Sequence, residues 1–218
     1  MHGLGGNVYC DYYSGLHLST GQISSPGYSG DGDLTKQMNA PRSIEPGFLP
    51  GTLVIADTGN NRVRLIDPAN KTMTTIAGNG QKFDNGDGGP ATAASLYHPK
   101  HAVFDSAGNL YISTEKGFIR KVEPSGTIST IAGRLLSEGG IPQQTGVAIK
   151  MYLSAPTGLA VDNANKFLYV ADTGNNRILR IGLNTGMAQT VAGTGLVGFN
   201  GDGIAALAAN LSAPTQVG

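Results

Sequence analysis

Short apolar runs alternate with glycine- and proline-rich turns along most of this chain. Near its middle, a proline-led run at 98–105 is followed by runs at 110–113, 118–123 and 127–132. Each run has the length of a β-strand, and the segments between them carry the Gly, Pro, Asn and Ser residues that favour tight turns. The pattern therefore predicts four short β-strands in succession, joined by turns.

The same four-strand unit recurs along the chain. Its second strand runs into a polar turn, and copies begin at residues 53, 110 and 168, which are 57 and 58 residues apart. Two copies contain the turn Asp-Thr-Gly-Asn-Asn-Arg, and a Thr-(Ile/Val)-Ala-Gly motif ends the fourth strand. A Gly-Asp-Gly motif follows at 30–32, 86–88 and 201–203, but near Gly139 and Gly140 its aspartate is lost. Four strands at this period predict the blades of a β-propeller.

The chain divides into one degenerate repeat, three fuller repeats and a terminal strand. The first repeat lacks its first strand, and the terminal strand begins a further blade or closes the ring. We also expect a short helical turn in the loops at 90–96 and 204–211. The boundaries of the repeats and of the terminal strand are approximately 1–38, 39–95, 96–152, 153–210 and 211–218.

The unit at 153–193 carries a specific sequence pattern. It reads Pro-Thr-Gly-Leu-Ala-Val-Asp, then Leu-Tyr-Val-Ala-Asp-Thr-Gly-Asn-Asn-Arg-Ile, then Thr-Val-Ala-Gly. This pattern resembles the NHL-repeat family of β-propellers, and the resemblance covers essentially the whole chain. It implies an all-β propeller of four-stranded blades, typically six in a ring. With about four repeats, we expect either a closed four-bladed ring or a segment of a six-bladed ring, and favour the segment. A segment would expose blade edges through which copies could self-associate.

Composition narrows the function classes. Lys plus Arg and Asp plus Glu both number 15, so the formal net charge is zero. Nucleic-acid binding is disfavoured because it needs a basic footprint. Charged residues make up only 14% of the chain and it contains 33 glycines, which favours a turn-rich β protein over a helical bundle.

Cysteine content and hydropathy bear on the setting of the protein. A single cysteine, Cys10, excludes an intramolecular disulfide and a multi-cysteine zinc site. No apolar run approaches the roughly 18 residues of a membrane helix, so we expect no membrane insertion. The first residues lack the regions of a signal peptide. Low charge and high glycine content slightly favour an extracellular or periplasmic setting, and are also compatible with a cytosolic one.

The repeated polar turns are best interpreted as structural. Asp and Asn cap turn backbones, and Asn and Gly tolerate positive φ. An arginine at the same place in two units can brace the next turn or blade, so we expect these residues to support the fold rather than carry chemistry. The structural set is Asp57, Asn60, Arg62, Asp172, Asn175 and Arg177.

Two clusters suggest metal binding as an alternative. Asp84 and Asp87 could contribute carboxylates to Ca²⁺, which prefers six to eight oxygen ligands, but the loop offers few others. His98 and His101 lie on a proline-led strand that would line a propeller channel and could bind Zn²⁺. The positions matching His101 in the other repeats are Ser43, Gly158 and Gln216, so convergent ligands are missing. We therefore expect a tight inter-blade loop and no cofactor.

The resemblance implies a non-enzymatic scaffold that binds a protein or a small-molecule ligand through its inter-blade loops and channel mouth. An alternative is a metal-dependent propeller enzyme, resembling lactonases or amidating lyases. A second alternative is the RNA binding known for some NHL propellers. The candidate binding residues at the starts of the proline-led strands are Arg42, Lys100, His101, Thr157 and Gln216.

Overall fold

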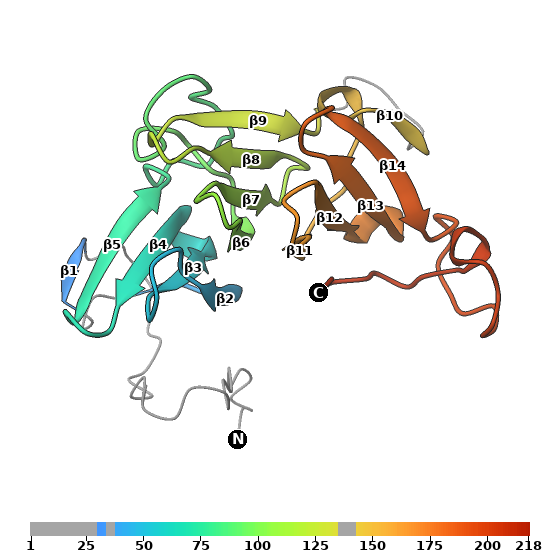
Figure 1. Cartoon of the computed structure of the whole chain (residues 1–218), viewed down its shortest axis with the longest axis horizontal. Coiled ribbons are helices and arrows are strands. Elements are labelled where there is room, and N and C mark those ends of the chain that lie inside the picture. Colours follow the sequence, from blue (N-terminus) through green and yellow to red (C-terminus); the bar gives the residue numbers. More distant parts are fainter. Residues whose placement is uncertain (1–29, 34–37, 135–142) are drawn as a thin grey trace.

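A computed structural model describes residues 30–33, 38–134 and 143–218. Three antiparallel sheets stand side by side as the blades of an open arc (Figure 1). Most of the degenerate repeat at 1–38, and the loop around Gly139 and Gly140, lie outside the described residues. The all-β expectation is confirmed.

Blade I contains five strands in the order β1-β5-β4-β3-β2. Its strands are β1 (Gly32–Asp33), β2 (Ser43–Pro46), β3 (Leu53–Asp57), β4 (Arg62–Asp67) and β5 (Thr72–Ala77). A 3-10 turn, η1 (Thr58–Asn60), connects β3 to β4, and Asn61 after it has a left-handed φ of 53°. The Asp-Thr-Gly-Asn-Asn turn thus owes its tight path to an asparagine that tolerates this conformation.

Blade II contains the four strands predicted within residues 98–132. Its strands are β6 (Pro99–Phe104), β7 (Leu110–Thr114), β8 (Ile119–Val122) and β9 (Ile128–Ala132), in the order β6-β7-β8-β9. The four predicted strands are confirmed to within two residues at each end. In the segment 90–96, expected to contain a helical turn, residues 91–93 form a hydrogen-bonded turn, and the N–H groups of Ala93 and Ala94 both donate to the Pro90 carbonyl (3.0 and 3.2 Å).

Blade III again has five strands, in the order β10-β14-β13-β12-β11. They are β10 (Thr145–Val147), β11 (Leu159–Val161), β12 (Phe167–Asp172), β13 (Arg177–Gly182) and β14 (Met187–Ala192). The 3-10 turns are η2 (Ala148–Lys150), η3 (Thr173–Asn175) and η4 (Ala206–Ala208). The last of these lies where the second helical turn was predicted.

The blades pack through apolar side chains between neighbouring sheets. Val54, Leu96 and Ile112 belong to one buried cluster that joins blade I to blade II. Tyr111 and Leu179 belong to a second that joins blade II to blade III. Since each blade buries its apolar faces against its neighbours, the loops that lead from one blade to the next are held on a rigid frame.

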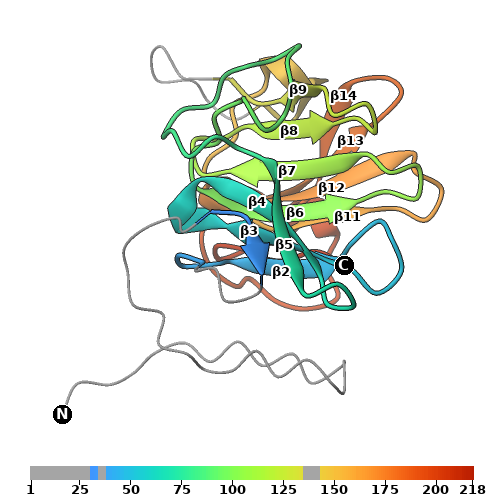
Figure 2. The same cartoon turned by 90° about the vertical axis from the view of Figure 1, so that its left-hand side faces the viewer.

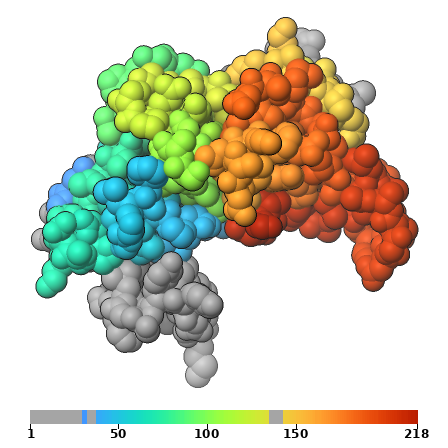
Figure 3. All heavy atoms as spheres, in the orientation of Figure 1, coloured from blue at the N-terminus to red at the C-terminus, as the bar shows by residue number. Residues whose placement is uncertain are grey.

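The arc is open, so of the two predicted forms the structure agrees with the segment, which was favoured, and not with the closed four-bladed ring (Figures 1 and 2). Residues 211–218, predicted as a terminal strand, are not assigned as a strand, but they lie beside blade III, where the Gly158 N–H donates to the Thr215 carbonyl (3.0 Å). The residues after β14 form a lobe at the end of the arc (Figure 3).

Candidate functional site

Each blade holds a segment from the unit that precedes it in the chain. In blade I, β1 pairs with the outer strand β5. In blade II, the Gly88 N–H donates to the Ile128 carbonyl (2.8 Å), and the Ile128 N–H donates to the Gly89 carbonyl (3.0 Å). In blade III, β10 pairs with β14. The Gly-Asp-Gly loops at 30–32 and 86–88 therefore complete the outer edge of the next sheet, and in blade III β10 does so without this motif.

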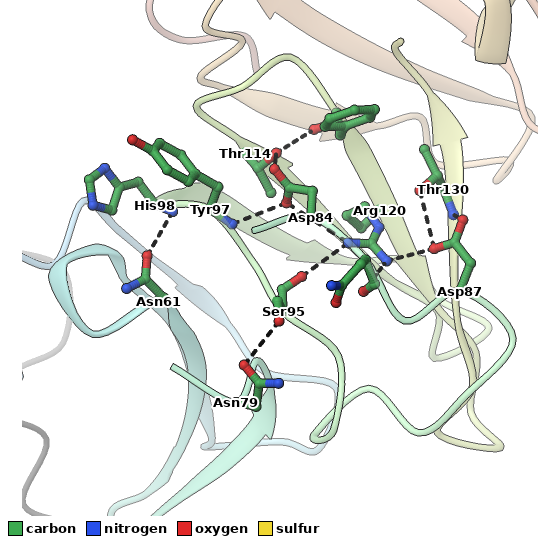
Figure 4. Close-up of polar contacts among 12 residues, drawn as sticks. Asn61, Asn79, Asp84, Asp87, Ser95, Tyr97, His98, Thr114, Arg120 and Thr130 are labelled. Atoms are coloured by element: carbon green, nitrogen blue, oxygen red, sulfur yellow. Dashed lines mark hydrogen bonds and ion pairs between the residues drawn. The ribbon is translucent and has the colours of Figure 1, made fainter. Parts of the chain in front are cut away.

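The Gly-Asp-Gly aspartate fixes this connection through its side chain. Asp87 Oδ1 lies 2.6 Å from Arg120 Nη2, and Asp87 Oδ2 accepts the Thr130 N–H at 3.0 Å (Figure 4). In blade I, Asp31 makes the corresponding contacts with Arg64 at 2.9 Å and with Thr75 at 2.8 Å. We call this three-residue arrangement, found as Asp31–Arg64–Thr75 and as Asp87–Arg120–Thr130, the aspartate clamp.

A second carboxylate lies on the buried side of Arg120. Asp84 Oδ1 is 3.8 Å from Arg120 Nη1, and the Asp84 carboxylate accepts hydrogen bonds from the Tyr97 N–H and the Thr114 hydroxyl, both at 3.1 Å (Figure 4). Burial raises the pKa of Asp84 to about 6, although Arg120 opposes the shift. Asp84 and Asp87, the candidate calcium ligands, thus flank a guanidinium. Among the described residues, no group of three or more His, Cys, Asp or Glu could hold a metal ion.

The buried carboxylate comes from a different chain position in the other blades. In blade I, Asp57 at the end of β3 lies 3.4 Å from Arg64 Nη1. In blade III, Asp172 at the end of β12 lies 2.8 Å from Arg177 Nε. Burial raises the pKa of both aspartates, and the arginines oppose this effect. Blade II has Thr114 where the other blades have aspartate, and Asp84 supplies the missing charge from the loop.

The repeated turn motif is part of this internal network. The side-chain amides of Asn60 and Asn175 donate to Asp57 and Asp172 at 2.9 and 2.8 Å. The sequence grouped Asp57 with Arg62, but the ion pair of Asp57 is with Arg64. Arg62 instead donates to the carbonyls of Asn60 (3.0 Å) and Asn79 (2.8 Å).

A second polar cluster lies at the start of blade II, beside the proline-led strand. Lys100 Nζ and His98 Nδ1 lie 2.6 and 3.2 Å from the Glu115 carboxylate. The Tyr97 ring lies against the His98 ring at 4.6 Å, and Lys116 Nζ lies 4.4 Å from the Tyr97 ring centroid. The hydrogen bond from Lys100 is the main cause that lowers the pKa of Glu115. We call these five residues the mouth cluster. It is partly exposed, and Lys116 is its most open member.

With this geometry established, the chain can be compared with known proteins. The family model of the Teneurin NHL domain matches residues 68–216. The chain belongs to the Teneurin NHL domain family. Teneurin-1 of Gallus gallus is 34% identical over 145 residues, and Teneurin-4 of Mus musculus is 32% identical over 151 residues. These alignments cover 60% and 62% of this chain, which spans only 5% of either relative.

Solved structures show the same fold at low sequence identity. An auxiliary nutrient binding protein from Bacteroides thetaiotaomicron superposes with a TM-score of 0.59 and 20% identity, covering 83% of this chain and 43% of the other. The family match confirms the NHL-repeat resemblance, and the superposition agrees with the predicted fold. No helix in the described parts of this NHL domain is long and apolar enough to cross a membrane.

The predicted binding residues of this NHL domain have different environments. Lys100 joins the mouth cluster, whereas His101 is buried, with Nε2 3.1 Å from Glu45 and no partner for Nδ1 among the described residues. Thr157 donates to the Thr215 carbonyl at 2.9 Å. Arg42 is exposed just before β2, and Gln216 is exposed in the terminal segment 211–218.

Sequence analysis missed several partners of these residues. Glu45 faces His101 from blade I, and Glu115, Lys116 and Tyr97 complete the mouth cluster. Glu115 and Lys116 occupy the place of the Asp-Thr-Gly-Asn-Asn turn in blade II. The departure of this turn from the repeat was the available signal, because a residue that breaks a structural repeat is free to serve another purpose.

Proposed function

We propose that this NHL domain is a non-enzymatic binding scaffold that recognises a protein segment through its inter-blade loops and channel mouth. The observation that carries the proposal is the mouth cluster. Its rings and charged groups are partly exposed on a frame held by buried aspartate–arginine pairs. Rigid frames that present aromatic and cationic side chains are suited to recognition, because little ordering is needed on binding.

The charged residues in and near the mouth cluster suggest what kind of segment it binds. Lys116 is exposed above the Tyr97 ring, and Arg42, at the position in blade I that corresponds to Lys100, is exposed as well. Glu115 offsets Lys100. The remaining positive charge and the aromatic ring suit a segment that carries carboxylates and an aromatic residue.

The groups that an enzyme would need are engaged in internal pairs. His98 faces Glu115, His101 faces Glu45, and Asp84 and Asp87 flank Arg120. A metal-dependent enzyme would need several of these side chains to converge on one ion. The alternative predicts that Zn²⁺ or Ca²⁺ raises the melting temperature, and that a chelator reverses the rise; we expect neither effect.

Binding is tested by titrating the full chain with two synthetic peptides, one of alternating Glu and Tyr and one of alternating Lys and Tyr. We expect calorimetric binding of the acidic peptide only, weakened about fivefold by Lys116→Glu. Lys121→Glu is the matched control, since Lys121 lies on β8, where it pairs with Glu123 (3.3 Å). Equal binding of both peptides, or equal effects of the two variants, would contradict the proposal.

RNA binding is the remaining alternative, and the formal net charge of zero gives it little support. A gel shift with single-stranded RNA at low and moderate salt separates it from protein recognition. We expect no salt-sensitive complex.

A further inference from the structure

A cavity of about 530 Å³ lies between blades II and III, which stand side by side in Figure 1. One wall is the face of blade II formed by β7, β8 and β9. The other wall consists of two turns of blade III, one containing Asn165 and one running from Gly182 to Gly186. The lining includes no residue of the mouth cluster. The volume falls within the range of small-molecule sites, roughly 300–1,000 Å³.

The blade II wall of this cavity is polar where the corresponding row of blade I is largely apolar. Tyr111, Lys121 and Ser129 lie opposite one another on β7, β8 and β9. Their counterparts in blade I are Val54, Leu65 and Thr74. Val54 packs in the buried apolar cluster that joins blade I to blade II. An interface that serves only packing does not need an ammonium group at this place, because burying one is costly unless it finds polar partners.

Several polar groups of this row keep hydrogen-bonding capacity that the chain does not use. The Lys121 side chain is 25% exposed, and its Nζ donates to Glu123 Oε1 at 3.3 Å. An ammonium group has three N–H donors, so two of them remain. Glu123 Oε2 and the Ser129 hydroxyl have no hydrogen-bond partner within residues 30–33, 38–134 and 143–218. Donors and acceptors are therefore available next to one another along one wall.

Tyr111 adds an acceptor to this wall because its own proton is committed elsewhere. Its hydroxyl donates to Asp105 Oδ2 at 3.1 Å. Burial, reinforced by the neighbouring Asp105 carboxylate, raises the pKa of Tyr111, so the phenol stays protonated. Asp105 also accepts the N–H groups of Ala107 (3.0 Å) and Asn109 (2.8 Å) and the side-chain amide of Asn109 (2.8 Å). Asp105 thus belongs to the frame, and the Tyr111 oxygen retains the ability to accept.

The blade III wall is apolar and is fixed to blade II beside the cavity. Ile181 and Leu183 contribute the apolar side chains of this wall. The Asn165 side-chain amide donates to the Ser106 hydroxyl at 2.6 Å, which links the turn of blade III to the turn that follows β6. The two walls are therefore held in place before any ligand arrives, so that little ordering is needed on binding.

We propose that the cavity between blades II and III binds a neutral ligand with several hydroxyl groups, of the size of a monosaccharide. A hydroxyl group donates and accepts at once, which suits a wall where the donors of Lys121 lie beside the acceptors of Glu123 and Tyr111. The charges of Lys121 and Glu123 already offset each other. A charged ligand would lose its hydration without finding a free counter-charge. This site is separate from the mouth cluster and does not depend on the function proposed for it.

The proposal is tested by NMR titration of the full chain with three neutral probes: D-glucose, D-galactose and myo-inositol. We expect at least one of them to shift the amide signals of Ser129, Gly182 and Gly186 in a saturable way, with a Kd of about 1 mM or lower. The amide of Lys116, in the mouth cluster, should not shift. Absence of a saturable shift at the cavity with all three probes would overturn the proposal, as would shifts confined to the mouth cluster.

Matched variants locate the binding. Ser129→Ala and Lys121→Met each remove hydrogen-bonding groups from the polar row, and we expect either change to weaken binding of the responding probe about fivefold or more. Thr74→Ala is the control, because Thr74 holds the place of Ser129 in blade I, and it should leave the affinity unchanged. Amide signals outside the cavity report whether each variant keeps its fold. Wild-type affinity in both cavity variants would overturn the proposal.

A charged analogue tests the neutrality of the ligand. The two sugars are compared with their uronates, glucuronate and galacturonate, which carry a carboxylate in place of one hydroxymethyl group. We expect the uronate of a sugar that binds to do so about fivefold more weakly or worse, because Lys121 is already paired with Glu123. A uronate that binds as tightly as its parent sugar, or more tightly, would show that the cavity takes an anion and that the proposed class of ligand is wrong.

Discussion

Blades II and III fasten the preceding segment by different means. In blade II a side-chain clamp, in which Asp87 binds Arg120 and Thr130, adds to the main-chain hydrogen bonds of Ile128. In blade III main-chain pairing is more extensive: β10 pairs with β14, the Thr190 N–H donates to the Gln144 carbonyl at 2.7 Å, and Arg177 donates to the Gln143 carbonyl. A carbonyl oxygen thus takes over the position that the Asp87 carboxylate holds in blade II.

In blade III the aspartate and the arginine of the clamp are both absent, whereas its threonine is retained as Thr190. Arg64, Arg120 and Leu179 lie opposite Thr75, Thr130 and Thr190, each directly after a bulge in the register. Blade III has leucine at this position, and the loop before it lacks the Gly-Asp-Gly aspartate. A buried guanidinium that loses a carboxylate partner is destabilised, so the aspartate is not expected to be lost while the arginine remains.

The largest effect is expected from Arg120→Leu, which gives blade II the blade III residue. Arg120 is fully buried between Asp84 and Asp87, so its loss leaves a buried carboxylate unpaired. We expect a loss of about 3–5 kcal/mol in urea unfolding at neutral pH. Leu179→Met, the control in blade III, should lose less than about 1.5 kcal/mol. Adding Asp84→Asn to Arg120→Leu should restore part of the loss; no recovery would mean that the unpaired charge is not the cause.

The next effect is the pH dependence that Asp84 contributes in blade II. Burial raises the folded pKa of Asp84 from 3.8 to about 6. The contribution of the protonated Asp84 carboxyl to the free energy of unfolding is therefore fully present below pH 3.8. It is lost as the pH rises through about 6. Relative to Asp84→Asn, the wild type should lose about 2–3 kcal/mol between pH 4 and pH 7.5. Urea unfolding across this range checks it. A carboxyl carbon of Asp84 that titrates by NMR near its ordinary value would contradict it.

The contribution of the clamp aspartate can be measured by comparing Asp87, which contacts the next blade, with Asp202, which does not. Asp87→Asn removes the charged partner of Arg120 and Thr130, and we expect a loss of about 1–3 kcal/mol. Asp202→Asn changes the corresponding aspartate where no blade covers it, and should stay within about 0.5 kcal/mol of wild type. Thermal unfolding of both variants provides the comparison. Similar losses at both sites would show that the aspartate acts within its own loop rather than on the next blade.

Local features of the fold could be predicted from sequence, because strands, turns and repeats are set by residues near one another in the chain. The strands of blade II and the Asn61 turn are examples. The clamp could not be predicted, since Asp87 and Arg120 are 33 residues apart and belong to different repeats. One signal was available: the loop lacking aspartate precedes the blade with Leu179 instead of arginine.

The candidate site could be predicted only in part for a similar reason. Lys100 and His98 follow from their place on the proline-led strand. Glu115 and Lys116 lie on a turn that departs from the repeat, so no repeat-based reasoning assigns them a partner. Similarly, Asp84 suggested a metal ligand because its carboxylate was visible in the sequence, while the guanidinium that neutralises it was distant.

The smallest effect distinguishes the threonines of the two blades. The Thr130 hydroxyl donates to the Asp87 carboxylate at 3.2 Å, whereas the Thr190 hydroxyl only accepts a long contact of 3.4 Å from Arg177. Valine has the shape of threonine without the hydroxyl, so Thr130→Val should lose about 1 kcal/mol and Thr190→Val less than about 0.5 kcal/mol in urea unfolding. In an Asp87→Asn background the loss from Thr130→Val should shrink, because both changes remove the same hydrogen bond. Additive losses would instead show that Thr130 acts independently of the clamp, and the two blades would then differ only in how their outer strands pair.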